Sequence, residues 1–172
     1  NKTFKNDFIQ AISGLIIKAF EENEGSILAF LPGVREIKQV QTFLKAKLAN
    51  DLDIYPLYGA MSFDEQQKAI LPSCRRKLIL ATSIAETSLT IKDIRIVIDS
   101  GLTRRSRFDP SSGMSRLITE RVTKAEAIQR MGRAGRTNTG VCYKMWTKGE
   151  EGGLKPFPEP EILVSDLSSL AM

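Results

Sequence analysis

Three short runs of almost entirely apolar residues place the strongest constraint on the fold. They read SILAFL from Ser26, KLILAT from Lys77 and IRIVID from Ile94. A strand without a polar face is buried on both sides, as in parallel sheets that helices cover. Segments with helical apolar spacing accompany these runs at residues 8–20 and 35–49. This alternation predicts an α/β fold with a mostly parallel sheet and helices on both faces.

Two capping boxes predict where further helices begin. Ser62 followed by Glu65 opens a helix that is expected to end near Ile70. Thr123 followed by Glu126 opens a second helix, which is expected to carry the arginines that follow it.

Short strands are expected at residues 53–58 and 140–146, and residues 104–121 predict a β-hairpin with a longer loop. Three prolines after residue 155 indicate a linker. The expected organisation is therefore one domain over residues 1–155, followed by a linker and the start of a helical region over residues 156–172.

Composition is that of a globular protein, with 42% apolar and 26% charged residues among 172. The net charge is +5, and residues 101–136 alone hold nine Lys or Arg against three acids. So concentrated a basic segment favours a polyanion such as nucleic acid or nucleotide phosphate. Chance clustering on a solvated surface remains the alternative.

Several function classes lack support in the sequence. The chain has no His, which removes the commonest catalytic base and metal ligand, and no metal site is expected. Cys74 and Cys142 have no metal-like spacing, so free thiols in a reducing cytoplasm are expected. No apolar run of about 18 residues occurs, and no signal peptide is recognised, so no membrane contact is expected.

The stretch AIQRMGRAGRTNTG, residues 127–140, carries arginines three apart at Arg130, Arg133 and Arg136. If the stretch is helical, Gln129, Arg133 and Arg136 share one face. Guanidinium groups bind phosphate oxygens through paired hydrogen bonds, so this face could stabilise phosphoryl transfer. A generic basic patch is the alternative.

Two strand ends could bind phosphate. Residues 78–91, LILATSIAETSLTI, end a strand at Thr82-Ser83 and continue with further hydroxyls, and residues 30–37 place Pro32-Gly33 after another strand. Ligands of parallel sheets gather at this edge, although capping and turn chemistry also favour such residues. No G-x-x-x-x-G-K-[ST] loop is present, and no D-E-x-x box follows a strand to hold Mg²⁺. Arginines without a phosphate-binding loop indicate half of a composite site, whose other half would supply that loop.

Taken together, these segments resemble the DExH/DEAH branch of superfamily 2 helicases, over nearly the whole chain. FLPG at residues 30–33 resembles that family's motif IV, ATSIAETSLTI at residues 81–91 its motif V, and QRMGRAGR at residues 129–136 its motif VI. The amino-acid sequence of these segments is most similar to that of bacterial HrpB-type helicases. The resemblance implies the second, C-terminal RecA-like domain, a three-layer domain of the P-loop NTPase type with an inserted β-hairpin.

The resemblance also implies roles for individual residues. Gln129, Arg133 and Arg136 would face the γ-phosphate as the catalytic set, and Ser88 and Thr90 would lie near the nucleotide. Contacts to the nucleic-acid backbone would come from the strand ends and the hairpin, through Gly33, Thr82, Ser83, Arg104 and Arg105.

Two positions depart from the family pattern. Lys92 stands where many members have an acidic residue, and Ile70 stands where an aromatic often stacks on adenine. Nucleotide contact near Lys92 is therefore in question, and weak base selectivity is expected.

The predicted function is the C-terminal motor domain of an ATP-dependent RNA helicase that binds single-stranded nucleic acid. ATP and Mg²⁺ would be held mainly by an upstream RecA-like domain of the same chain, so the isolated domain is expected to be inactive. A non-catalytic nucleic-acid-binding module and a DNA helicase or translocase of the same superfamily remain alternatives.

Overall fold

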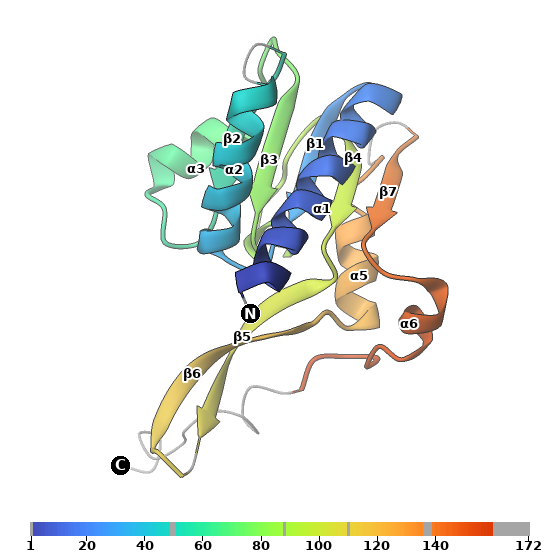
Figure 1. The fold of residues 1–172 in the computed structure, drawn as a ribbon. Helices are drawn as coiled ribbons and strands as arrows, with labels where there is room; N and C mark the ends of the chain where they lie inside the picture. Colours follow the sequence, from blue (N-terminus) through green and yellow to red (C-terminus); the bar gives the residue numbers. More distant parts are fainter. Residues whose placement is uncertain (1, 49–50, 88, 110, 136–138, 160–172) are drawn as a thin grey trace.

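A parallel sheet forms the centre of the domain in the computed structural model, which describes residues 2–48, 51–87, 89–109, 111–135 and 139–159. Within these residues the sheet has five strands, in the order β2-β3-β1-β4-β7, and every neighbouring pair is parallel (Figure 1). The strands are β1 (Ser26–Phe30), β2 (Asp53–Leu57), β3 (Lys77–Ala81), β4 (Ile94–Asp99) and β7 (Val141–Lys144). The predicted α/β class and the predicted strands are confirmed.

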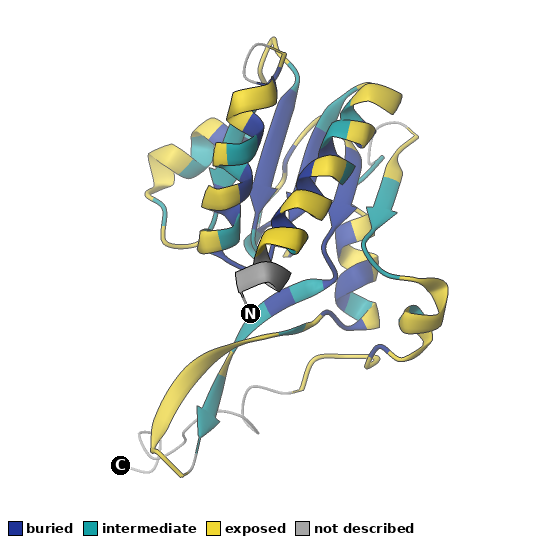
Figure 2. Ribbon diagram, viewed as in Figure 1, coloured by how far each residue is buried: buried dark blue, intermediate teal, exposed yellow. Residues whose placement is uncertain are grey.

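Helices cover both faces of the sheet. On one face, α1 (Lys2–Glu22) and α2 (Val34–Leu48) pack in one core cluster with the odd-numbered β1 residues Ile27 and Ala29. On the other face, α3 (Phe63–Ile70) and the short α4 (Ile84–Thr87) pack with the even-numbered β1 residues. Helix α5 (Lys124–Met131) contacts both α4 and β4. Strands β1, β3 and β4 are therefore buried on both sides along most of their length, as their almost entirely apolar runs predicted (Figure 2).

A β-hairpin extends away from the sheet, made of β5 (Leu102–Asp109) and β6 (Met114–Arg121) (Figure 1). The two strands are antiparallel, and the register pairs Leu102 with Arg121 and Asp109 with Met114. Most of β6 is exposed to solvent (Figure 2). The predicted hairpin is thus confirmed, and its base continues directly from the end of β4.

Both predicted capping boxes are present, at Ser62 with Glu65 and at Thr123 with Glu126. A third one was not predicted: Thr147 and Glu150 form the same reciprocal pair and open α6 (Lys148–Gly152). The contacts from Thr147 and Arg121 lower the pKa of Glu150 to about 2. The expected linker and helical region at residues 156–172 lie mostly outside the described residues.

The prediction that the second capped helix carries all the arginines is wrong for Arg133. Helix α5 ends at Met131, with Gly132 as its C-cap. Backbone bonds from Arg133 to Arg130 and from Ala134 to Met131 tighten the chain into turns, and Gly135 has a φ of 75°. The left-handed Gly135 redirects the backbone at no steric cost, so the helix does not resume after these turns. Gln129 and Arg133 therefore do not share one helical face.

No helix within the described residues is both long enough and apolar enough to cross a membrane.

Two glycines allow a test of this packing. Gly101 has a φ of 73°, and a Cβ there would lie 2.8 Å from Cε3 of Trp146, whereas Gly14 in α1 has no atom within 4 Å of a built Cβ. We expect Gly101→Ala to lower the free energy of unfolding by about 1–3 kcal/mol, because it combines backbone strain with a clash. Gly14→Ala should raise it by about 0.5–1 kcal/mol. Urea unfolding measures both, and equal effects of the two substitutions would contradict the packing described.

Candidate functional site at the carboxyl edge of the sheet

The carboxyl ends of β1, β3 and β4 meet in one row. Leu31 donates its N–H to the carbonyl of Ala81 at 2.8 Å, and Ser100 donates to the carbonyl of Phe30 at 3.2 Å. Thr82 donates to the carbonyl of Leu57 at 3.1 Å, which brings β2 into the same row. The predicted candidates that directly follow β1 and β3 therefore lie along one edge of the sheet.

The motif V segment, residues 81–91, leaves β3 through a tight turn into α4. Ala85 and Glu86 donate their N–H groups to the carbonyls of Thr82 and Ser83. Ala85 and Glu86 are buried, whereas Ser83 is exposed and Thr82 is half-buried. This leaves the hydroxyl-bearing residues at the turn toward solvent. Thr90 is exposed as well, and Ser88 lies outside the described residues.

Arg130 points into the protein rather than toward a ligand. Its side chain is fully buried, with Nε donating to Glu86 Oε1 at 2.7 Å and Nη1 donating to Asp99 Oδ1 at 2.8 Å. Nη1 also donates to the carbonyl of Leu102 at 3.2 Å, and the guanidinium lies 4.9 Å from the ring centroid of Phe30. We refer to Arg130, Glu86 and Asp99 as the buried triad.

The electrostatics of the buried triad follow from its burial. Burial raises the pKa of Glu86, and the adjacent Arg130 only partly offsets this effect. For Arg130, burial acts to lower the pKa, but the charges of Asp99 and Glu86 outweigh it and the pKa is raised. The arginine therefore stays charged and neutralises carboxylates that would otherwise be costly to bury.

Arg133 is also largely buried, with 7% of its surface exposed, and it contacts the motif V segment. Nε donates to the carbonyl of Glu86 at 2.8 Å, Nη2 donates to the same carbonyl, and Nη1 donates to the carbonyl of Leu89 at 2.7 Å. The turn after α5 is thus docked on the carbonyls of Glu86 and Leu89. This contact joins the predicted motif VI to the predicted motif V.

Gly33 lies against an arginine of the hairpin. A Cβ at residue 33 would come within 2.4 Å of Arg104 Nη1, so a larger residue there would displace this guanidinium. Arg104 is held by Glu36, with 3.0 Å between Nη2 and Oε1, and its side chain remains 32% exposed. The motif IV turn and the base of the hairpin are therefore in direct contact, beside a cavity of about 180 Å³.

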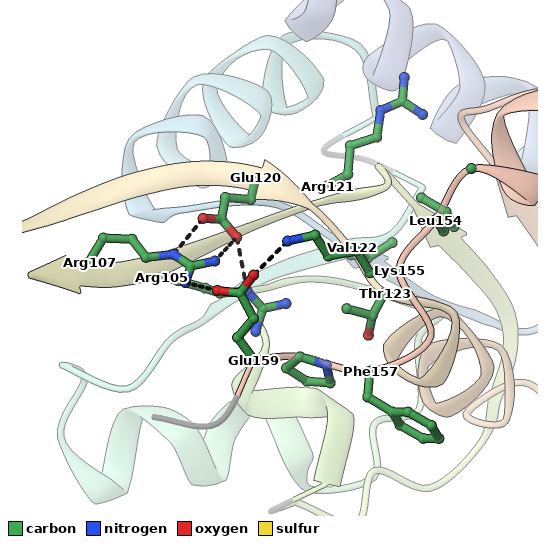
Figure 3. Close-up of a pocket in the computed structure, with 12 residues that line it drawn as sticks. Arg105, Arg107, Glu120, Arg121, Val122, Thr123, Leu154, Lys155, Phe157 and Glu159 are labelled. Carbon is green, nitrogen blue, oxygen red and sulfur yellow. Dashed lines mark hydrogen bonds and ion pairs between the residues drawn. The ribbon is translucent and has the colours of Figure 1, made fainter. Parts of the chain in front are cut away.

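Arg105 and Arg107 are engaged in a network of ion pairs along strand β5 of the hairpin. Arg105 pairs with Glu126 at 2.7 Å. It also pairs with Glu120 at 3.4 Å, and Arg107 pairs with Glu120 at 2.8 Å and with Glu159 (Figure 3). The bonds from Arg107 lower the pKa of Glu120. These groups border a cavity of about 290 Å³ between the hairpin and residues 153–159.

The structure thus brings together part of the predicted site. Gly33, Thr82 and Ser83 follow the strand ends of one edge, and Arg133 docks on the segment that leads from there to Thr90. Gln129 is exposed on α5, and Arg136 lies outside the described residues. The sequence interpretation missed the buried triad, although Glu86 and Asp99 were visible as acids next to apolar runs.

The sheet order, the inserted hairpin and the docking of motif VI on motif V define a RecA-like helicase domain. The chain belongs to the family described as the helicase conserved C-terminal domain, whose model matches residues 7–138. The predicted family and fold are confirmed.

Sequence similarity to individual helicases supports this family assignment. The chain is 47% identical over 167 residues to the ATP-dependent RNA helicase HrpB of Escherichia coli, covering 96% of this chain and 21% of HrpB. It is 35% identical over 168 residues to the ATP-dependent RNA helicase HrpA of the same organism, covering 98% of this chain and 13% of HrpA.

A solved structure has the same fold. The crystal structure of the Escherichia coli DEAH/RHA helicase HrpB matches with a TM-score of 0.87 at 46% identity, over 97% of this chain and 21% of that chain. The chain therefore spans about one fifth of the length of HrpB.

The buried triad allows a stability test. We expect Arg130→Met to lower the free energy of unfolding by about 3–5 kcal/mol near neutral pH, because two buried carboxylates lose their cation. Arg121→Met, which removes the exposed pair with Glu150, should cost less than about 1 kcal/mol. Chemical denaturation measures both, and similar losses would mean that Arg130 is not buried in an ion cluster.

The free energy of unfolding of Arg130→Met should depend on pH. Because burial raises the pKa of Glu86 above its ordinary value of 4.5, the folded state binds the proton more readily than the unfolded state. The stability lost in Arg130→Met should therefore be partly regained as the pH falls from about 7 toward that ordinary value. A loss that does not change with pH would contradict this account.

Proposed function

We propose that the chain is the second motor domain of an ATP-dependent RNA helicase, acting on nucleotide and nucleic acid together with an upstream RecA-like domain. One observation supports this most: the turn that carries Arg133 docks on the motif V segment, next to the edge that bears Gly33, Thr82 and Ser83. Arginines and hydroxyls that converge at a strand-end edge suit phosphate recognition. The names of the relatives give the substrate class of the proposal, ATP and RNA.

In the proposed mechanism, Gln129, Arg133 and Arg136 face the γ-phosphate across the cleft between the two domains. Guanidinium groups would stabilise the charge that spreads over the transferred phosphoryl oxygens. Ser88 and Thr90 would contact the nucleotide or its attacking water. Mg²⁺ is assigned to the upstream domain and the phosphates, and within the described residues no group of three or more His, Cys, Asp or Glu is arranged to hold a metal ion.

Nucleic acid would bind along the same edge through its backbone. Gly33, Thr82 and Ser83 offer backbone N–H groups and hydroxyls, which suit phosphate oxygens without reading sequence. Arg104 supports the proposal because a third of its side chain is exposed beside Gly33. Arg105 would contact a phosphate only while sharing its guanidinium with Glu126 and Glu120.

A test of the catalytic role uses the full-length protein. We expect Arg133→Ala and Arg136→Ala each to lower the RNA-stimulated ATPase rate by about 10³-fold or more, because an arginine finger contributes about 10³–10⁵. Nucleotide affinity should change little, since the contact strengthens in the transition state. Lys18→Ala is the control, because Lys18 lies on α1 with 62% of its side chain exposed.

Unchanged ATPase rates in both arginine variants would reject the proposed motor function. Retained RNA binding in those variants would then favour the alternative of a non-catalytic binding module.

A second test addresses nucleic-acid binding. Arg104→Gln should weaken binding of single-stranded RNA and reduce the slope of log affinity against log salt by about 1, because one phosphate contact is lost. Glu36→Gln is the matched control, since it breaks the same ion pair but keeps Arg104. Fluorescence anisotropy at several salt concentrations measures both.

Equal weakening by Arg104→Gln and Glu36→Gln would assign the effect to the ion pair rather than to a phosphate contact. A DNA oligonucleotide of the same sequence tests the alternative of a DNA translocase. Equal affinity for DNA would remove the preference for RNA, because only the 2′-hydroxyl distinguishes the two backbones.

A further inference from the structure

Glu86 holds both arginines that the described part of motif VI contributes, and it does so through different atoms. Its carboxylate accepts from Arg130 Nε at 2.7 Å, and its backbone carbonyl accepts from Arg133 Nε at 2.8 Å and from Arg133 Nη2. One residue of α4 therefore contacts two arginine side chains, one from α5 and one from the turn that follows it.

The carboxylate is largely withdrawn from solvent and is engaged by Arg130. The Glu86 side chain is only 9% exposed, and its Oε1 is bonded to an arginine that is fully buried. Its neighbours are charged as well: Asp99 lies across Arg130, and Glu126 acts to raise the pKa of Glu86. A role for Glu86 must therefore operate through the arginines that it holds.

Burial of such a group is costly, and apolar packing would often stabilise a fold as well or better. A buried ion cluster does fix geometry, because a guanidinium and a carboxylate meet in few orientations. The bond from Glu86 to Arg130 joins α4 to α5 and so helps to fix the position of α4 relative to α5. That position in turn sets the carbonyl on which Arg133 docks.

We propose that Glu86 is a positioning residue for Arg133: its bond to Arg130 holds the carbonyl that orients the Arg133 guanidinium toward the nucleotide. This inference rests on the proposed function, in which Arg133 faces the γ-phosphate. Loss of the carboxylate leaves Arg133 present but displaced. A displacement of about 1 Å at a catalytic group is enough to slow a reaction about 10²-fold.

The test is a double-mutant cycle in the full-length protein, with RNA-stimulated ATPase as the readout. Glu86→Gln should lower kcat by about 10–100-fold. It should change KM for ATP by less than about threefold, because the contact is proposed to act in the transition state. In an Arg133→Ala background the same substitution should have almost no further effect, since the group that it positions is gone.

Asp99→Asn is the matched control. It also removes a buried carboxylate from Arg130, but the Asp99 side chain accepts from Arg130 Nη1 and from the N–H of Gly101, whereas the Glu86 backbone accepts from Arg133. We expect the two variants to lose similar thermal stability, while Glu86→Gln loses at least about tenfold more kcat. If Glu86→Gln does not fold, Glu86→Asp, which keeps the charge but shortens the side chain, goes through the same cycle.

The outcomes separate this inference from the proposed function. If Arg133→Ala lowers kcat and Glu86→Gln multiplies that loss, or has no effect of its own, the positioning role is overturned and the motor function stands. Equal losses of kcat in Glu86→Gln and Asp99→Asn would also overturn it, because both would then act through stability. If Arg133→Ala leaves the rate unchanged, both the proposed function and the positioning role fail.

Discussion

The buried triad is the interaction on which the carboxyl edge of this domain depends. Arg130 of α5 bridges Glu86 of α4 and Asp99 at the end of β4, with Phe30 of β1 beneath its guanidinium. An unpaired charge in this position would cost several kcal/mol, about 3–5 in comparable cases, so these elements are strongly biased toward one arrangement. With α4 and α5 in this arrangement, the turn after α5 lies against motif V, where Arg133 donates to the backbone carbonyls.

Most of the arginines in the hairpin form ion pairs with glutamates of the same domain. Arg104, Arg105 and Arg107 each bind glutamates, and Arg121 pairs with Glu150. A charge count over residues 101–136 therefore overstates the field that a polyanion would meet. The ion pairs instead attach the hairpin to α2, α5 and the chain near residues 150–159. A hairpin of two strands is only marginally stable alone, so these attachments help to hold it in place.

The fold could be predicted to a large extent because its signals are local. Runs of almost entirely apolar residues identified β1, β3 and β4, since a strand buried on both faces has no polar alternation. Reciprocal Ser or Thr and Glu pairs located the starts of α3 and α5. The same pattern at Thr147 was missed because several glycines follow it, and glycine is a poor helix former.

The candidate site could be predicted only in part. Sequence resemblance named Gly33, Thr82, Ser83 and Arg133, and the structure places the first three along one edge and Arg133 on the adjoining segment. The sequence did not show that Arg133 lies beyond the end of helix α5, because a spacing of three residues between arginines is compatible with helical periodicity. Gly132 and Gly135 decided against a continuous helix.

By itself the sequence determined which segments become strands and helices, where two helices begin, and which family motifs the chain carries. Those properties depend on neighbours along the chain, within a few residues. The tertiary structure decided which of the arginines in motif VI is buried and what each one holds. Glu86 and Asp99 lie 44 and 31 residues before Arg130 in the chain, and only the packing of α4, α5 and β4 brings their charges together.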